Sequence, residues 1–233
     1  MPNRIRVKRM TGAMRIIHWV TVFCVVASII TGLYIAYPYY QSLIADPAVD
    51  KYVMAWNRWI HFISAIMLDV TAIVIAYLYF FSRFDRPYRK LIPNKANMVE
   101  FSEVFLNLVT LNRRKNFDTE HSDSFNTVFF FVLHIMLLLL LFTGLQMYVH
   151  GLNSGESSIG AWWPWILHVG TDWTLWIFDG KMGVRYVHHL LMWLVMIWAM
   201  FHIYYQVWRT IFWREGDIAI VFGGEKFVRK NNG

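Results

Sequence analysis

The sequence predicts an all-α integral membrane protein, built as a four-transmembrane-helix bundle in a single membrane domain over residues 1–233. Of the 233 residues, 57% are hydrophobic and 16% are charged, whereas soluble domains average about 25% charged residues. The apolar residues form four long blocks, and the basic residues gather between alternate blocks. This composition excludes a disordered chain and argues against a soluble globular domain.

The four apolar blocks match the thickness of a bilayer, which needs about 20 mostly apolar residues per helix. Helices are expected because a helix satisfies its own backbone hydrogen bonds in lipid. The first block is expected to remain in the protein, since its apolar run is too long for a signal peptide and lacks a small-x-small exit. The predicted spans are residues 16–37, 59–81, 125–149 and 184–208.

Basic residues predict the direction of the spans. The N-terminal segment, the loop between the second and third spans and the C-terminal tail hold eighteen Lys and Arg residues, against four in the two other loops. The positive-inside rule then places both termini in the cytoplasm. This topology explains the net charge of +7, and since no nucleic-acid motif accompanies that charge, no nucleic-acid partner is expected.

Two loops are expected to carry structure of their own. Residues 97–111 space their apolar side chains as a short amphipathic helix does, and we expect this helix on the cytoplasmic surface. Residues 161–178 are rich in Trp, which favours an aromatic belt at the opposite interface, with a docking surface for a partner as the alternative. The single cysteine, Cys24, excludes a disulfide framework, a Cys-rich zinc site and a cysteine-ligated iron–sulfur cluster.

Histidines are the most informative polar residues of the chain. His188 and His202 lie on the last span, fourteen residues apart. At about 100° per residue they share nearly one face, separated by about 21 Å along the axis. His61 opens the second span and His18 opens the first. In the predicted topology His61 therefore shares a level with His188, and His18 shares a level with His202.

Two imidazoles at one depth on different helices are typical of bis-histidine ligation of a haem iron. A buried haem also offsets the cost of placing histidine in lipid. A lone histidine near a helix end is more often an interfacial residue, but two layers of two, matched in depth and face, favour ligands. A zinc site would need three or four ligands at one depth. We therefore expect two stacked haems and an electron path across the bilayer.

A short internal repeat lies beside the outer histidine level. Residues 31–33 and 143–145 both read Thr-Gly-Leu, in the outer parts of two spans that run outward. Glycine there allows either the close approach of a flat macrocycle or close helix packing. Asp69 is the one acid inside a span, a functional candidate whose role stays open. The other histidines are expected at the surface or in packing: His121, His134, His150 and His168.

Three motifs resemble the signatures of a known family. Residues 15–19 (RIIHW), continuing to Thr31-Gly32, resemble the first-helix signature of the cytochrome b subunits of membrane-bound nickel–iron hydrogenases. Residues 58–62 (RWIHF) are similar to its second helix, and residues 185–193 (RYVHHLLMW), continuing to His202, to its second signature. The tail over residues 214–227 is similar in character, so the resemblance covers nearly the whole chain.

The resemblance implies four transmembrane helices, two b-type haems and quinone reduction. It implies His18 and His202 as the ligands of one haem, and His61 and His188 as the ligands of the other. The chain would be the electron-transfer subunit of a hydrogen:quinone oxidoreductase in the bacterial cytoplasmic (inner) membrane. Hydrogen would be activated on partner subunits at the periplasmic face, an iron–sulfur small subunit and a large subunit. Electrons would pass from the outer haem to the inner haem and then to menaquinone or ubiquinone.

Two polar residues at the cytoplasmic entry of the third span, Asp123 and Asn126, are the candidates for contact with the quinone. The alternative for both is a helix N-cap or ordinary loop polarity. Two other functions are weighed against the hydrogenase subunit. One is the cytochrome b subunit of a formate dehydrogenase or thiosulfate reductase. The other is a non-redox membrane anchor or transporter, against which the two-layer arrangement of histidines argues.

Overall fold

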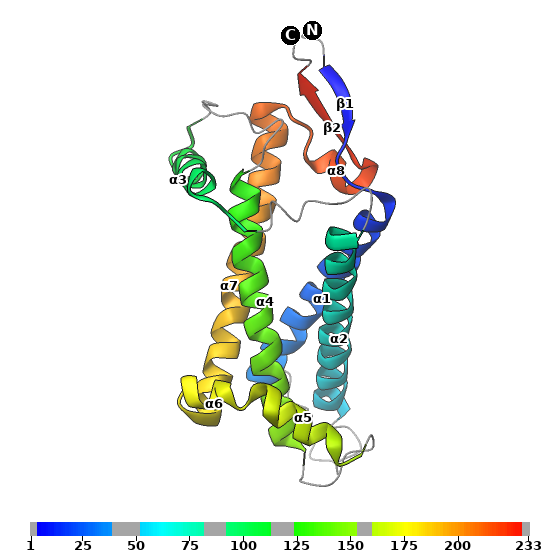
Figure 1. The fold of residues 1–233 in the computed structure, drawn as a ribbon, viewed down its shortest axis with the longest axis vertical. Coiled ribbons are helices and arrows are strands. Elements are labelled where there is room, and N and C mark those ends of the chain that lie inside the picture. The colour runs from blue at the N-terminus through cyan, green and yellow to red at the C-terminus, as the bar shows by residue number, and fades with distance from the viewer. Residues whose placement is uncertain (1–3, 39–51, 82–91, 113–123, 153–159, 230–233) are drawn as a thin grey trace. The chain divides into compact units, whose positions relative to one another are not determined.

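The structure is a computed structural model that describes residues 4–38, 52–81, 92–112, 124–152 and 160–229. Helices dominate the described residues (Figure 1). In chain order the elements are β1 (Arg4–Lys8), α1 (Gly12–Ala36), α2 (Tyr52–Phe81), α3 (Lys95–Val109), α4 (Ser124–Gly151), α5 (Trp162–Thr171), α6 (Trp173–Ile177), α7 (Gly180–Trp208), the π-helix η3 (Arg209–Trp213), α8 (Ile218–Gly223) and β2 (Glu225–Arg229).

Four of these helices, α1, α2, α4 and α7, are long and apolar enough to cross a membrane. This confirms the four predicted spans. The helices begin earlier than the apolar blocks, at Gly12, Tyr52 and Gly180 for α1, α2 and α7. Helical backbone continues past the apolar stretch because interfacial residues such as Trp56 can extend a helix beyond the hydrocarbon core.

The contacts divide the chain into two compact units. Unit 1 comprises residues 1–26, 66–132 and 198–233, and unit 2 comprises residues 27–65 and 133–197. Each of the four long helices contributes one part to each unit, so neither unit is a consecutive stretch of chain. The expectation of a single membrane domain over residues 1–233 stays a prediction.

Unit 1 contains a feature that the all-α prediction missed, a ribbon of two antiparallel strands. β1 pairs with β2 in a register that places Arg4 opposite Arg229 and Lys8 opposite Glu225 (Figure 1). The backbone amides of Arg9 and Met10 then donate to the carbonyl of Gly224. Each strand has five residues, most of them polar or charged. Its partner lies at the other end of the chain, so neither strand stands out in the sequence. The pairing brings the N-terminal and C-terminal segments together.

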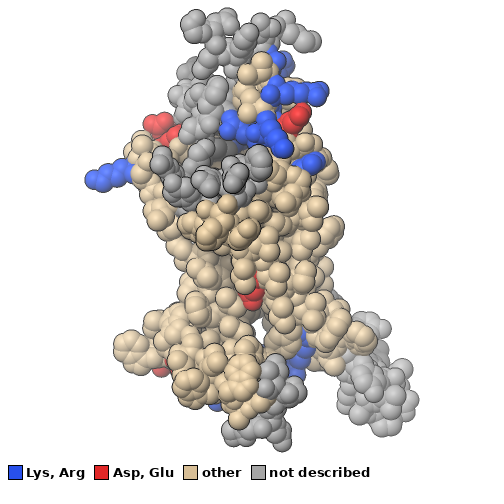
Figure 2. All heavy atoms as spheres, turned by 45° about the vertical axis from the view of Figure 1, so that its right-hand side comes forward, with Lys and Arg blue, Asp and Glu red and all other residues tan. Residues whose placement is uncertain are grey.

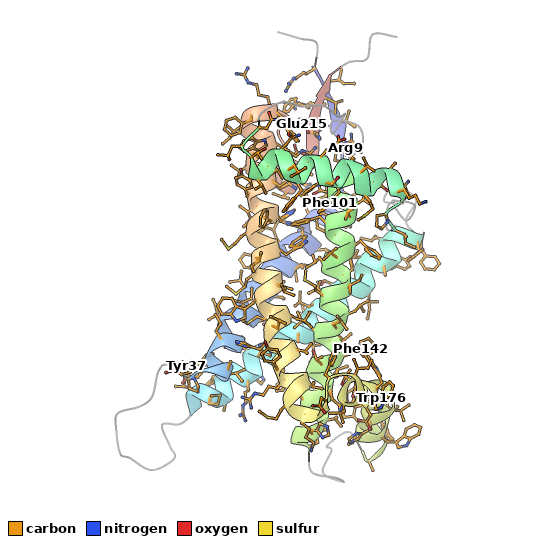
Figure 3. The ribbon with its side chains drawn as sticks, turned by 90° about the vertical axis from the view of Figure 1, so that its left-hand side faces the viewer. Arg9, Tyr37, Phe101, Phe142, Trp176 and Glu215 are labelled. Carbon is orange, nitrogen blue, oxygen red and sulfur yellow. The ribbon has the colours of Figure 1, made fainter. Side chains whose placement is uncertain are left out.

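The core of unit 1 lies where α3 crosses the first turns of α4 and the last turns of α7. Val104 and Leu108 of α3 are fully buried against Phe125, Tyr205 and Trp208. Figure 3 shows Phe101 directed from α3 toward this core, where its ring stacks on Phe125 at 4.9 Å between centroids. The structure confirms the helix predicted over residues 97–111. A reciprocal pair of hydrogen bonds between Asn94 and Asn97, a capping box, begins it.

Unit 2 contains the Trp-rich segment as two short helices, α5 and α6, between α4 and α7. The buried Gln146 links α4 to this segment through two hydrogen bonds. The Thr171 hydroxyl donates to Oε1 of Gln146, and Nε2 of Gln146 donates to Asp172 at 3.1 Å. Trp165 and Trp176 stay exposed, and Figure 3 shows Trp176 on the outer side of α6. The exposed rings agree equally with a membrane belt and with a docking surface, and both stay predictions.

Candidate functional site

The two histidines expected at the outer level are neighbours in unit 2. His61 of α2 and His188 of α7 are half-buried, and their ring centroids lie 6.4 Å apart with the ring planes at 65°. The two residues are separated by most of the chain, so this proximity is a product of the tertiary fold. It places two imidazoles from different helices next to each other.

Hydrogen bonds hold the His61 ring by its Nδ1 atom. Nδ1 lies 3.0 Å from the hydroxyl oxygen of Thr31 and 3.1 Å from the carbonyl oxygen of Ser28. The Thr31 hydroxyl donates its own proton to the carbonyl of Ala27 at 2.6 Å. A hydroxyl has one proton, so the Thr31 oxygen accepts from the ring. The proton of a neutral His61 is therefore on Nδ1, and Nε2 keeps a lone pair.

The His188 ring is held in the same way. Its Nδ1 lies 2.9 Å from the hydroxyl oxygen of Thr143, which donates to the carbonyl of Leu139 at 2.6 Å. The carbonyl of Leu140 is a further hydrogen-bond partner of the ring. Thr31 of α1 thus contacts a histidine of α2, and Thr143 of α4 contacts a histidine of α7 in the same way. The internal repeat in the sequence corresponds to a repeated contact in space.

The glycines of the repeat lie against the same two rings. A Cβ atom at Gly32 would lie 3.3 Å from Cε1 of His61, and one at Gly144 would lie 3.3 Å from Cε1 of His188. Both distances are tighter than ordinary van der Waals contact. Each glycine makes room for an imidazole ring of the neighbouring helix, and the two roles predicted for these glycines stay predictions.

The histidines expected at the inner level both belong to unit 1. His202 of α7 stacks on Trp198, with centroids 5.1 Å apart and planes at 7°, and meets Phe130 edge-on at 5.5 Å. His18 of α1 meets Trp19 edge-on at 5.7 Å. Among the described residues, the buried Nδ1 atom of His18 has no hydrogen-bond partner. Both inner rings therefore have aromatic neighbours within unit 1.

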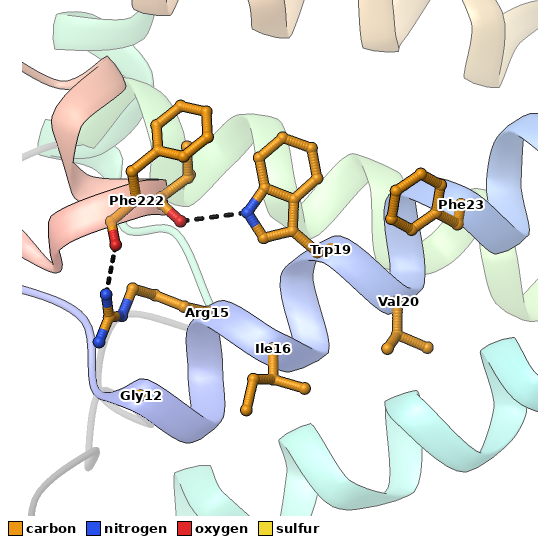
Figure 4. A pocket seen from close by; sticks show the side chains of 8 residues that line it. Gly12, Arg15, Ile16, Trp19, Val20, Phe23 and Phe222 are labelled. Carbon is orange, nitrogen blue, oxygen red and sulfur yellow. Dashed lines mark hydrogen bonds between the residues drawn. The ribbon is translucent and has the colours of Figure 1, made fainter.

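A groove of about 490 Å³ is lined by residues of α1 and α8. Figure 4 shows that the Arg15 guanidinium donates to the carbonyl of Phe222, and that Nε1 of Trp19 donates to the carbonyl of Val221 at 3.2 Å. Arg15 and Trp19 flank His18 in the first-helix motif. In the structure they bind α8 of the C-terminal tail, and Ile16, Val20 and Phe23 complete the apolar lining.

Comparison with known proteins identifies the family. The family model described as prokaryotic cytochrome b561 matches residues 9–224. The chain belongs to this family. Membership in a family of b-type cytochromes implies haem b, which agrees with four apolar helices and half-buried histidines.

Several relatives align with this chain along most of their own length. A protein of Bradyrhizobium diazoefficiens is 26% identical over 93% of this chain and 84% of its own length. A protein of Rhizobium leguminosarum bv. viciae is 25% identical over 93% and 87%, and one of Rhodobacter capsulatus is 23% identical over 91% and 78%. Each is named "Probable Ni/Fe-hydrogenase B-type cytochrome subunit".

The outer histidines of this cytochrome b561 family member have donor chemistry that suits haem iron. Neutral imidazole nitrogen is a common ligand of haem iron, and the two rings come from different helices with their centroids 6.4 Å apart. A metal-binding histidine also donates its other N–H to a fixed acceptor, as His61 does to Thr31 and His188 to Thr143.

The residues predicted to contact a quinone are not placed as a pair. Asn126 lies in the first turn of α4, in unit 1, where it is half-buried. Asp123 lies outside the described residues, as does His121. The quinone assignment stays a prediction.

Sequence reasoning missed a polar cluster at the end of α4. His150 and His168, expected as separate surface residues, have ring centroids 5.8 Å apart. His168 pairs with Asp172 at 2.9 Å, and Gln146 contacts both Asp172 and His150. Burial raises the pKa of Asp172, but the hydrogen bonds from His168 and Gln146 outweigh it and hold that pKa below its usual range. The spacing of His168 and Asp172, four residues apart on a helical segment, is the signal that could have found part of this cluster.

Proposed function

We propose that this chain is the di-haem b membrane subunit of a respiratory nickel–iron hydrogenase. It would anchor the periplasmic catalytic subunits and pass electrons from their iron–sulfur clusters to the quinone pool. The observation that carries the proposal is the His61–His188 pair, with both Nδ1 atoms bound by threonines, in a chain of the cytochrome b561 family. The names of the relatives support the hydrogenase as the partner.

Two histidine pairs would hold the two haems. His61 and His188 would bind the outer one and His18 and His202 the inner one, each in one of the two units. Bound haem b supplies one-electron transfer, whose potential the protein sets through its ligands, hydrogen bonds and burial. The chain orients its imidazoles by Thr31 and Thr143 on the outer side and by Trp198 and Phe130 on the inner side.

The distribution of charge supports an inward path for electrons. The described parts of the N-terminal segment, the loop with α3 and the C-terminal tail all belong to unit 1. Figure 2 shows Lys and Arg side chains gathered around the ribbon of β1 and β2 on this face. By the positive-inside rule this end is cytoplasmic. The iron–sulfur small subunit and the large subunit would then dock on the side of His61, and menaquinone or ubiquinone would be reduced near His202, with Asp123 and Asn126 as contacts.

Purification of the tagged chain from its native membrane tests the proposal. We expect co-purification of the small and large subunits of a nickel–iron hydrogenase, and two haem b per chain that become reduced under hydrogen gas. Dehydrogenase or reductase subunits in place of the hydrogenase would point to a formate dehydrogenase or thiosulfate reductase cytochrome. A reduced-minus-oxidised spectrum without a b-type band would overturn the haem assignment and leave the non-redox anchor or transporter.

A further inference from the structure

We propose that Thr31 and Thr143 are a matched pair of positioning residues, which fix the tautomer of the two outer haem ligands and hold the potential of that haem low. This inference rests on the proposed function, because it takes His61 and His188 as iron ligands. It concerns the second layer of side chains, which touch the ligands and not the iron. It assigns the Thr-Gly repeat a redox role.

The hydrogen-bond pattern supports the assignment of protons. Each threonine donates to the carbonyl four residues before it, at 2.6 Å in both cases. Each hydroxyl oxygen can therefore only accept from the imidazole beside it, at 3.0 and 2.9 Å. Thr31 and Thr143 are buried, so water does not compete for these contacts. The geometry selects the tautomer that carries its proton on Nδ1 and leaves Nε2 able to bind a metal.

The hydroxyl groups of Thr31 and Thr143 make contacts beyond the hydrogen bonds within their own helices. A hydroxyl in an apolar helix often binds a preceding backbone carbonyl without any further role. Thr71 does so in α2, where it donates to Leu68 at 2.8 Å and accepts from Thr21 at 3.4 Å. Thr31 and Thr143 differ because each also contacts a histidine ring, and the glycine that follows each of them leaves space for that ring. In each Thr-Gly unit, the threonine hydroxyl thus accepts a hydrogen bond from the ring, and the glycine lets the ring pack against the helix.

The expected consequence is electronic. An acceptor on Nδ1–H makes the imidazole a stronger donor to the metal. Stronger donation stabilises the oxidised iron more than the reduced iron and lowers the midpoint potential. Removal of either threonine hydroxyl should therefore raise the potential of the outer haem, while the carbonyls of Ser28 and Leu140 keep part of the effect. Thr31 and Thr143 belong to unit 2, whereas His18 and His202 belong to unit 1, so the inner haem should be unaffected.

The experiment is a redox titration of the purified protein with Thr31→Val, Thr143→Val and the double variant, followed in the haem absorption bands. We expect each single variant to raise the reduced-to-oxidised ratio of one haem up to about tenfold at a fixed ambient potential. A tenfold change corresponds to about 59 mV for one electron, and the double variant should show about the sum. Thr31→Ser and Thr143→Ser keep the acceptor and should titrate as the native protein. Thr21→Val is the matched control on α1.

Low-spin electron paramagnetic resonance signals are the second measurement, since they report the orientation and basicity of the two axial imidazoles. A changed signal for one haem in the valine variants, restored in the serine variants, supports the proposal. If a valine variant loses the outer haem, recovery by serine supports the proposal, and equal loss in serine overturns it, because the hydroxyl that serine retains would then not be what holds the ligand. Potentials and signals equal to those of Thr21→Val also overturn it. A native protein without two b-type haems would instead refute the proposed function.

Discussion

Adjacent histidines on α7 have different surroundings, and this difference decides which of them can serve as a ligand. His188 faces His61 and is bound by Thr143, whereas the Nε2 atom of its neighbour His189 accepts from Nε1 of Trp193 at 3.2 Å. Consecutive helical residues point about 100° apart. Only one of the two can therefore lie on the face that carries His202.

Substitution of single ligands should remove single haems. We expect His188→Ala and His202→Ala each to retain one haem per chain, and to lose different ones, because they belong to different units. Haem is counted against protein by the pyridine haemochrome assay, and the remaining haem is identified by its potential. His189→Ala is the control and should keep both. Loss of both haems in His202→Ala, with the chain still folded, would contradict independent sites.

The glycines beside the outer histidines should tolerate no side chain. Gly32→Ala and Gly144→Ala each place a methyl group 3.3 Å from a histidine Cε1 atom, so the ring must shift and the outer haem should bind less tightly. Gly151→Ala, also on α4, meets nothing within 4 Å. That control should be neutral or stabilising, since alanine favours a helix by about 1 kcal/mol over glycine. Haem retention during dilution into detergent measures the difference, and equal retention in all three variants would contradict the role of the contact.

At the scale of elements, a buried ion network joins the end of α7 to the tail. Arg209 and Lys226 each contact both Glu215 and Asp217, at 2.6 to 3.3 Å, and all four side chains are buried. The network balances two positive charges with two negative ones. It forms around η3, where the wider π-helical turn lets the chain reverse through Arg214 in the left-handed conformation. The tail is thereby tied to the helix that carries His202.

Removal of one charge should loosen the tail. We expect Glu215→Gln to cost about 3–5 kcal/mol in the local unfolding free energy of the tail, because it leaves two buried positive charges against the single negative charge of Asp217. Hydrogen exchange of the amides in β1 and β2 measures this cost. Glu225→Gln removes the exposed pair with Arg6 and should change exchange by less than about 1 kcal/mol. Equal protection in both variants would show that the network does not support the ribbon.

At the scale of the whole molecule, the distribution of basic residues predicts the direction of insertion. Lys95 begins α3 and Lys181 lies at the start of α7, and both are exposed. In a Cys24→Ala background, Lys181→Cys should react with a membrane-impermeant maleimide in intact spheroplasts. Lys95→Cys should react only after permeabilisation. The reverse pattern would place unit 1 outside and invert the proposed path of electrons.

Much of the fold and the proximity of His61 and His188 could be predicted, but not the contacts that hold their rings. The four spans, the helix α3 and the selection of His61 and His188 come from apolar length, periodicity and spacing. The roles of Thr31 and Thr143 could not be read in this way, although their repeat was visible. They act on residues 30 and 45 positions away, and which atoms meet depends on how the helices are rotated and packed.

What the sequence alone determined is the class of the protein, its four spans, their expected direction and the four histidines that are candidates for haem. Those features are local, since the bilayer selects about 20 apolar residues at a time and the positive-inside rule acts on the loops between them. The tertiary structure decided the tautomer of the outer histidines, the place of the two glycines, the buried ion network and the pairing of the chain ends. Each of these is a contact between distant residues, and its energy depends on atomic distances that no single segment contains.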